Sequence, residues 1–411
     1  MTDNILKDFP APAELLEWYE KNDSDTVHEV NGHLHTPYSF SAFRDMKQIF
    51  DMASAENIKV LGINDFYVTD GYEAFYKHSL GNRIFPLFNI EFIGLLKEEQ
   101  ERDIRINDPN NPGRTYFSGK GLNYPLITDP SVGRILQNLK YESQVQVKEM
   151  VDKVNAILAL TDASLSLKYS EIKRMYAREL VRERHIARAI KDLIFERYHS
   201  DAERLDIFEQ IYAGKKCHAS LSDPAALEIE IRGNLLKAGG RAFVPEDENA
   251  FLSVADIIDI ILRCGGIPCY PVLLDNPEGQ CTEYESDRQL LLNELISMGV
   301  HCIELIPGRN DPGFLREFVT FFNDNGFVIT FGTEHNTPGL SPLTVMARGT
   351  QPLDPELKRI SFEGTCVIAA HQYLHAQGHE GYVSPDGSTR EKDKEEFVAL
   401  GKAVIEKYIR K

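Results

Sequence analysis

Two histidines two positions apart are the first residues of this sequence whose spacing suits chemistry. His33 and His35 stand in "NGHLHTPYS", between a short extended segment and a helical one. Side chains at positions i and i+2 of a strand point to the same side, so the two imidazoles can bind one metal ion together. The pair alone leaves open the alternative of two histidines satisfied by ordinary hydrogen bonds.

Acidic residues and a further histidine stand at the ends of later predicted strands. Asp65 ends the strand over 58–65, Glu91 lies near the end of the strand over 83–92, and Glu334 with His335 ends "FVITFGTEH". In parallel β/α folds the carboxyl ends of the strands form the active face. Carboxylates there can complete the shell of an ion that the histidines hold. The joint pattern predicts a metal site.

Alternating strands and helices must position these residues. Strand, helix and strand follow one another through 58–92, which indicates parallel pairing. "TYFSGKGL" is a further candidate strand. The alternation resumes near residue 250, where Ser253 can cap one helix and Asp311 with Pro312 can begin another. We therefore expect an α/β fold with a parallel array of strands, closed as a barrel.

Between 129 and 245 the strand pattern gives way to helical spacing. One apolar helical face there is formed by Ile186, Ala189, Ile190, Leu193 and Ile194. We expect a discontinuous barrel over 1–128 and 246–411, with 129–245 as a mainly helical insertion over the mouth of the barrel.

Composition limits the classes of function. The chain has 411 residues and a net charge of -18, which argues against binding to a nucleic-acid backbone but not against a small phosphorylated substrate. No apolar run is long enough for a membrane span, and the first residues do not form a secretory signal. The six cysteines contain no CxxC pair, so we expect a reduced, cytoplasmic protein without a membrane. The sequence does not indicate an oligomeric state.

Several short motifs resemble, in order and spacing, those of the PHP family, the polymerase and histidinol phosphatase domain. They are "HLHT" with Ser39, "GIND", "IEF", "GGIPCYP", "IEL" and "FGTEH", and the resemblance extends over most of the chain. It implies a distorted (β/α)7 barrel of the TIM-like type with a helical insertion. Family members bind up to three metal ions and mostly hydrolyse phosphoesters.

The resemblance implies that one of the three metal sites is retained. The family's ligands for this metal have counterparts in His33, His35, Glu91 and Glu334. The other two sites have lost ligands. The second site lacks two histidines, whose positions carry Tyr116 or Phe117 and Tyr270. The positions of the third site carry Phe40, Phe66 and Asn336, unless His335 shifts to serve as a ligand there. We expect one divalent ion per chain, zinc, manganese or iron, with aromatic side chains filling the remaining space.

Six further residues are candidates for catalysis or substrate binding, and most of them also have a purely structural explanation. Tyr270 could act as a proton donor or be a packing replacement for a lost histidine, and His335 could act as a base. Asp65 is grouped with them as a catalytic candidate. Three candidates for substrate binding are Arg184 and His185, which resemble an insertion element that faces the phosphate, and Arg309, which follows "IEL". Solvated helical or loop positions are the alternative for all three.

The leading hypothesis is a metal-dependent phosphoesterase acting on a small phosphorylated substrate. The first alternative is a catalytically degenerate relative with a binding or structural role, and the second is a metal-dependent enzyme for a substrate without phosphate. A phosphoesterase requires a cationic clamp in the cleft. A degenerate protein predicts a cleft closed by Phe40, Phe66 and Tyr270.

Overall fold

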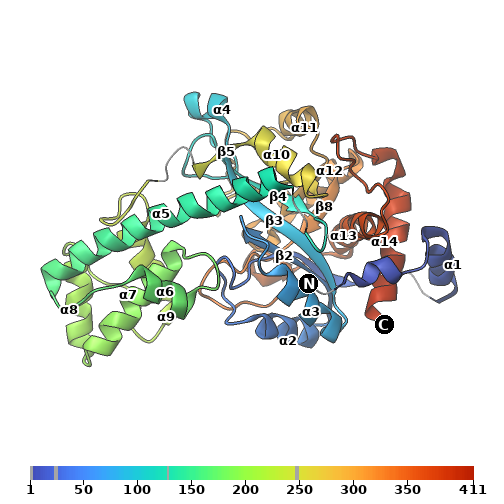
Figure 1. Cartoon of the computed structure of the whole chain (residues 1–411). Helices are drawn as coiled ribbons and strands as arrows, with labels where there is room; N and C mark the ends of the chain where they lie inside the picture. The colour runs from blue at the N-terminus through green and yellow to red at the C-terminus, as the bar shows by residue number, and fades with distance from the viewer. Residues whose placement is uncertain (1–2, 23–25, 127–128, 246–249) are drawn as a thin grey trace.

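One sheet, wound into a nearly closed barrel, organises the molecule (Figure 1). The structure is a computed structural model that describes residues 3–22, 26–126, 129–245 and 250–411. The strand order is β1-β2-β3-β4-β6-β7-β8, with β5 beside β3. The strands are β1 (Glu29–Leu34), β2 (Ile58–Phe66), β3 (Phe85–Leu95), β4 (Arg114–Lys120), β5 (Leu252–Ser253), β6 (Ile267–Val272), β7 (Cys302–Leu305) and β8 (Val328–Phe331), besides a small pair, β9 (Met346–Ala347) and β10 (Gln351–Pro352).

The barrel closes between the carboxyl ends of β1 and β8. Leu34 and Glu334 form a parallel bridge, and the N–H of His35 donates to the carbonyl oxygen of Glu334 at 2.7 Å. Gly332 makes this approach possible, because a Cβ at this position would lie 2.3 Å from the Cβ of His33. The closure therefore brings the last strand against the histidine pair.

The expected all-parallel order is wrong at one strand. β4 runs antiparallel to both of its neighbours, β3 and β6. The chain returns from β3 to β4 through the short helix α4 (Lys97–Glu101) and a loop, without a helical crossover that would bring it back parallel. The result is a mixed α/β, barrel-like sheet consistent with a TIM-like barrel, whereas the count (β/α)7 stays a prediction.

Helices cover the outside of this sheet. Two predicted helix starts are confirmed: the Ser253 hydroxyl accepts the Asp256 N–H, and the Asp311 carboxylate accepts the N–H of Gly313. The helices outside the insertion are α1 (Pro12–Asn22), α2 (Met46–Ala55), α3 (Tyr72–Asn82), α10 (Val254–Arg263), α11 (Arg288–Ser297), α12 (Pro312–Asp324), α13 (Pro355–Ala376) and α14 (Lys394–Ile409), with short 3-10 turns η1 (Ile5–Asp8), η4 (Pro307–Arg309), η5 (Arg348–Thr350) and η6 (Glu391–Asp393). None of the helices in the described ranges is long and apolar enough to cross a membrane.

The described elements between β4 and β5 are all helical and pack around a core of their own, which includes Met150, Ile190 and Phe208. They are α5 (Pro130–Thr161), α6 (Tyr169–Tyr176), α7 (Glu183–Arg197), α8 (Asp201–Ile211), α9 (Pro224–Ile231) and the π-helical turn η2 (Arg232–Leu236). The long α5 runs from the barrel to the far end of this lobe (Figure 1). The predicted boundaries at 128 and 246 lie outside the described residues, so the domain limits stay a prediction.

Candidate metal centre and anion cavity

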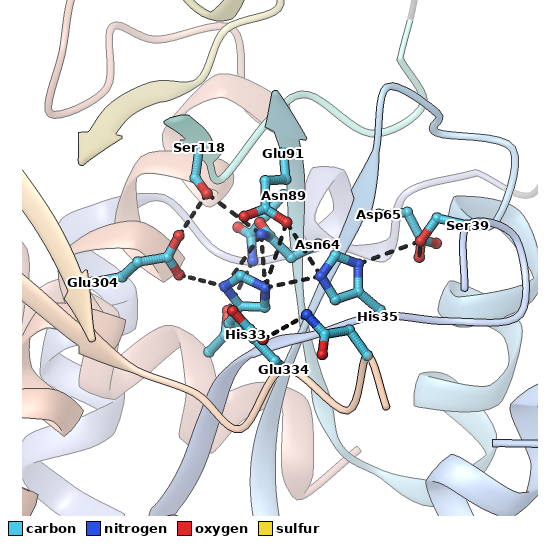
Figure 2. A network of polar contacts seen from close by, with 12 residues as sticks. His33, His35, Ser39, Asn64, Asp65, Asn89, Glu91, Ser118, Glu304 and Glu334 are labelled. Carbon is cyan, nitrogen blue, oxygen red and sulfur yellow. Dashed lines mark hydrogen bonds and ion pairs between the residues drawn. The ribbon is translucent and has the colours of Figure 1, made fainter. Parts of the chain in front are cut away.

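His33 at the end of β1, His35 just after it and Glu91 on β3 meet inside the barrel (Figure 2). Ligand atoms of His33, His35 and Glu91 all lie within 4.8 Å of one another, and the three side chains are buried. The Nε2 atoms of the histidines are 3.5 Å apart, and Glu91 Oε2 is 3.2 Å from His35 Nε2. Neighbouring parallel strands bring these residues to the carboxyl-end side of the sheet, because β1 pairs with β2 and β2 with β3.

A buried carboxylate supports His33 from behind. Glu304, on β7, accepts a hydrogen bond from His33 Nδ1 at 2.8 Å, so Nε2 carries the lone pair that could bind an ion; the amide nitrogen of Asn64 lies 3.1 Å from this Nε2. The ammonium of Lys120 is 2.5 Å from the same carboxylate and also donates to Asn64 at 3.2 Å. Burial would raise the pKa of Glu304, but Lys120 and His33 hold it well below its usual range. Glu304 is therefore an anion that orients His33 and strengthens it as a ligand.

A second carboxylate supports His35 through a hydroxyl. His35 Nδ1 lies 3.3 Å from Ser39 Oγ, and Ser39 donates to Asp65 at 2.6 Å. Asp65 also accepts the backbone N–H of Thr36 at 2.7 Å, so it anchors the loop that follows β1. Asp65 thus holds the histidine in place. Burial lowers the pKa of His35, which keeps the imidazole in its neutral, ligating form.

The three-residue group fits a divalent ion. Oε2 of Glu91 is buried and has no hydrogen-bond partner, although a carboxylate at that depth normally has one. Burial raises the pKa of Glu91 to about 8. A bound cation would satisfy this oxygen and, by favouring the ionised carboxylate, would counter the effect of burial on its pKa. Two neutral imidazole nitrogens and one carboxylate oxygen are a donor set of the kind that zinc and similar metals take at catalytic sites.

Glu334 lies beside this group, but its carboxylate points to other partners. Arg309 and Asn336 both donate to Oε2, the latter at 2.6 Å. Both Glu334 and His335 have left-handed backbone conformations, with φ of 60° and 55°. Such strain in residues other than glycine is typical of functional sites. Arg309, and to a lesser extent the neighbouring histidines, holds the pKa of Glu334 below its usual value against the effect of burial.

A cavity of about 860 Å³ opens beside the three-residue group, within the range of small-molecule sites. Phe40 and Phe66 line it without closing it. Its lining also contains His33, Glu91, Glu304 and Glu334. Six cations line it as well: Arg114, Arg182, Arg184, Arg232, Lys237 and Arg309.

Two aromatic rings at the predicted ligand-loss positions lie under arginines of the insertion. The guanidinium of Arg182 lies 4.9 Å from the centroid of the Phe66 ring, and that of Arg184 lies 5.3 Å from the Phe40 ring. Phe66 also stacks on His35, with ring centroids 4.9 Å apart. The aromatic residues therefore connect the metal group to the cations of the insertion.

Four other candidate residues, all within the described ranges, do not line the cavity. Tyr270 donates its hydroxyl to Glu285 at 2.9 Å, and Asp65 faces the loop after β1. The ring nitrogens of His335 bond to Thr333 and Ser341, so neither is available as a base. His185 accepts the Arg182 N–H, and burial lowers its pKa to about 3.

The structure adds residues to which the sequence analysis assigned no role. Glu304 and Lys120 support His33, Arg182 faces the cavity, and Arg232 with Lys237 extends its cationic lining. A signal for the first two was present in the sequence, because each is a charged residue inside or at the end of an apolar strand segment. A buried charge requires a partner, which marks such positions for attention.

No family model and no curated protein match this chain. Solved structures do match. One, a Bifidobacterium adolescentis protein proposed to be a metal-dependent phosphoesterase, has a TM-score of 0.52 at 15% identity, covering 82% of this chain and 96% of that one. An amidohydrolase from Chromobacterium violaceum, solved with sulfate and without metal, has a TM-score of 0.51 at 16% identity, covering 81% and 95%. These likenesses show a shared fold.

Proposed function

We propose that this protein is a metal-dependent hydrolase of the phosphoesterase type, acting on a small phosphorylated substrate. One observation carries the proposal: the ligand atoms of His33, His35 and Glu91 converge, and His33 and Glu91 line a cavity with six cationic and five acidic side chains in a protein of net charge -18. The lining of the cavity therefore has slightly more cations than anions, although the whole chain is strongly acidic, and this local balance favours an anionic substrate.

Each group has a role in this proposal. His33, His35 and Glu91 would hold one divalent ion, which supplies Lewis-acid activation and charge neutralisation. Glu334 is proposed as a fourth ligand, which requires its carboxylate to leave Arg309. Arg309 would then be free to bind a phosphoryl oxygen, as a guanidinium does with two parallel hydrogen bonds. Glu304 and Asp65 keep the two histidines oriented throughout.

The fold shared with a proposed metal-dependent phosphoesterase and an amidohydrolase supports the same class of reaction. The test is metal analysis of protein purified without chelator, followed by phosphate release from a panel of phosphomonoesters with added Mn²⁺ or Zn²⁺. We expect about one ion per chain and metal-dependent release. Glu91→Gln should lack both, and Glu73→Gln, on the exposed face of α3, should behave like the parent. Phosphate release that persists in Glu91→Gln would contradict the proposal.

A second candidate function is binding without turnover. It is favoured by His335 and Tyr270, whose polar atoms are engaged away from the cavity, so neither is placed for proton transfer. In that case the protein would bind metal and phosphate with the same residues, and no ester in the panel would be hydrolysed. Saturable phosphate binding without release would favour this candidate over the first.

A further inference from the structure

The wall of the cavity opposite the barrel is built by the insertion. We call the insertion wall the group formed by Arg182, Arg184, Arg232 and Lys237 around Glu183, all of which line the cavity. Arg182 immediately precedes α7, and Arg184 lies in its first turn. Arg232 begins η2, and Lys237 follows its end. Because α7 and η2 pack against each other, these side chains meet.

A π-helical turn brings two of these cations together. The Lys237 N–H donates to the carbonyl of Arg232 at 3.1 Å, five residues back, whereas α9 before it is an ordinary α-helix. Such turns are rare and occur frequently at functional sites. Here Arg232 Nη2 is 3.5 Å and Lys237 Nζ is 3.6 Å from the Glu183 carboxylate. Both distances exceed those of strong ion pairs, so neither cation is firmly held.

The insertion wall carries more positive charge than it neutralises. Burial, and then the charge of Arg232, lower the pKa of Arg184 to about 10, while burial lowers the pKa of Lys237. Lys237 and Arg232 lower the pKa of Glu183 although burial opposes them. Nε of Arg232 is buried without a hydrogen-bond partner. Four cations share one carboxylate, and a bound anion would relieve the repulsion between them.

The positive end of a helix adds to this effect. α7 is 15 residues long, and its N-terminus lies at the cavity between Arg182 and Arg184. The first N–H groups and the dipole of a helix favour an anion at that end.

From this arrangement we infer a second anion subsite at Arg184, Arg232 and Lys237, separate from the metal group. Given the proposed function, the substrate carries two anionic groups: the phosphoryl group that is cleaved, at His33, His35 and Glu91, and a second phosphate or carboxylate at the insertion wall. Anion binding at the insertion wall does not itself require metal.

Inorganic phosphate titrated into metal-free protein at low ionic strength, followed by calorimetry, tests the subsite. We expect saturable binding that is at least about 10-fold weaker in Arg232→Gln/Lys237→Met. The matched control, Arg174→Gln/Lys216→Met, removes the same charge from exposed positions of the insertion and should stay within about twofold. Succinate in place of phosphate distinguishes a carboxylate subsite from a phosphate subsite.

A variant with the opposite effect guards against loss by misfolding. Glu183→Gln removes the carboxylate that competes for the cations, so it should bind phosphate more tightly than the parent. In metal-loaded protein, an alkane bisphosphonate of suitable length should bind at least about 10-fold more tightly than the corresponding monophosphonate. Once one phosphonate is bound at the metal group, the linker holds the second phosphonate near the insertion wall, so its binding is intramolecular. Arg232→Gln/Lys237→Met should abolish this gain.

The two ideas fail in different ways. Metal-free parent protein that binds no phosphate, or equal binding by the parent and the double variant, would overturn the second subsite and leave hydrolysis untouched. Protein that binds phosphate at the insertion wall but neither metal nor bisphosphonate at the barrel would overturn the proposed function alone.

Discussion

The barrel wall and the insertion wall of the same cavity hold their charges in different ways. On the barrel wall, Glu304 and Lys120 are almost wholly buried and lie 2.5 Å apart, so each has a fixed partner. On the insertion wall, Lys237 and Arg232 stand 3.6 and 3.5 Å from one shared carboxylate, and the Lys237 side chain is 49% exposed. The first arrangement is rigid and neutralised, and the second is loose and positively charged.

This difference corresponds to two kinds of ligand. A metal ion requires donor atoms held at a fixed spacing, which strands provide because their Cβ positions are set by pairing across the sheet. An organic anion varies in shape, and long cationic side chains at helix ends can adapt to it. We therefore expect substitutions on the barrel wall to act on stability and metal affinity, and those on the insertion wall to act on anion affinity.

The largest expected effect is on the barrel wall, at Glu304. Glu304→Gln leaves the buried ammonium of Lys120 without its anionic partner, which costs about 3–5 kcal/mol of unfolding free energy. Denaturant unfolding of the metal-free protein measures this cost. Glu304→Gln/Lys120→Met removes both charges and should recover most of the stability. In both variants, metal affinity should be about 10- to 100-fold weaker than in the parent protein, because His33 has lost its supporting carboxylate.

An exposed ion pair provides the control for that experiment. Glu283 pairs with Arg105 at the surface, so Glu283→Gln should cost no more than about 1 kcal/mol. If Glu304→Gln were as stable as the parent, or if Lys120→Met restored metal affinity as well as stability, the barrel wall would not be the neutralised unit described above.

The next effect is on metal affinity alone. Glu91→Gln keeps the size of the side chain but removes the carboxylate, whose Oε2 lies 3.2 Å from His35 Nε2 and 3.9 Å from His33 Nε2. We expect the affinity for Zn²⁺ or Mn²⁺ to fall by more than about 100-fold, beyond the loss typical of supporting residues. Competition with a chromogenic chelator measures it. Phosphate binding by the metal-free protein should not decrease, and a parallel loss there would mean that the two walls are one site.

The sequence predicts the barrel wall better than the insertion wall, for a physical reason. His33, His35 and Glu91 lie in or directly after strands whose apolar patterns are local, and the rule that carboxyl ends of strands gather at one face places them without further information. The role of Glu304 cannot be predicted from its apolar segment alone, because it depends on Lys120 at the end of β4 and His33 on β1, each separated from β7 by one strand in the barrel.

Three features could not be obtained from local patterns. The reversed direction of β4 depends on how the loop after β3 returns. The left-handed backbone at Glu334, which turns its carboxylate to Arg309, is not visible in strand periodicity. Arg232 and Lys237 reach the cavity only because a π-helical turn packs on a helix about fifty residues earlier in the chain. Phe40 and Phe66, expected to fill the space of the two lost metal sites, are buried and also line the cavity, and Phe66 stacks on His35.

A smaller effect, on stability alone, is expected away from both walls. Tyr270 donates to the buried Glu285 carboxyl, which also accepts the N–H groups of Leu273 and Leu274. Tyr270→Phe should cost about 1 kcal/mol of unfolding free energy and leave the affinities for metal and phosphate unchanged. Turnover that falls without a change in stability would return Tyr270 to the catalytic residues.

The pH dependence of that cost follows from Glu285. Burial raises its pKa to about 7, so the unfolded chain releases the proton at a lower pH than the folded protein does. Its contribution to stability is therefore greatest at acid pH and decreases as pH rises to about 7. Tyr270 donates a hydrogen bond to Glu285, so losing that donor destabilises the ionised Glu285 carboxylate further. The loss of unfolding free energy in Tyr270→Phe should therefore be larger at pH 8 than at pH 5. Thermal unfolding at both values measures the difference, and Glu285→Gln should abolish it.

The smallest expected effect is on the insertion wall, at an aromatic side chain that holds no charge itself. Arg184 lies over the Phe40 ring at 5.3 Å, and the ring of His185 lies 4.9 Å from the same ring between centroids. Phe40→Leu keeps an apolar side chain but removes the π face. A cation–π contact of this kind is worth about 0.5–1 kcal/mol, so phosphate should bind the metal-free variant roughly two- to fivefold more weakly.

Metal affinity should not change in Phe40→Leu, since the Phe40 ring packs on His185 and Arg184 and not on the rings of His33 or His35. The matched control is Phe117→Leu, which removes a buried ring of the barrel core that does not line the cavity, and should lower stability without changing phosphate affinity. If Phe40→Leu weakened metal binding and left phosphate binding intact, the ring would belong to the barrel wall. Phe40 would then have to be grouped with the metal-binding residues of the barrel wall, and its contact with Arg184 would not contribute to anion binding at the insertion wall.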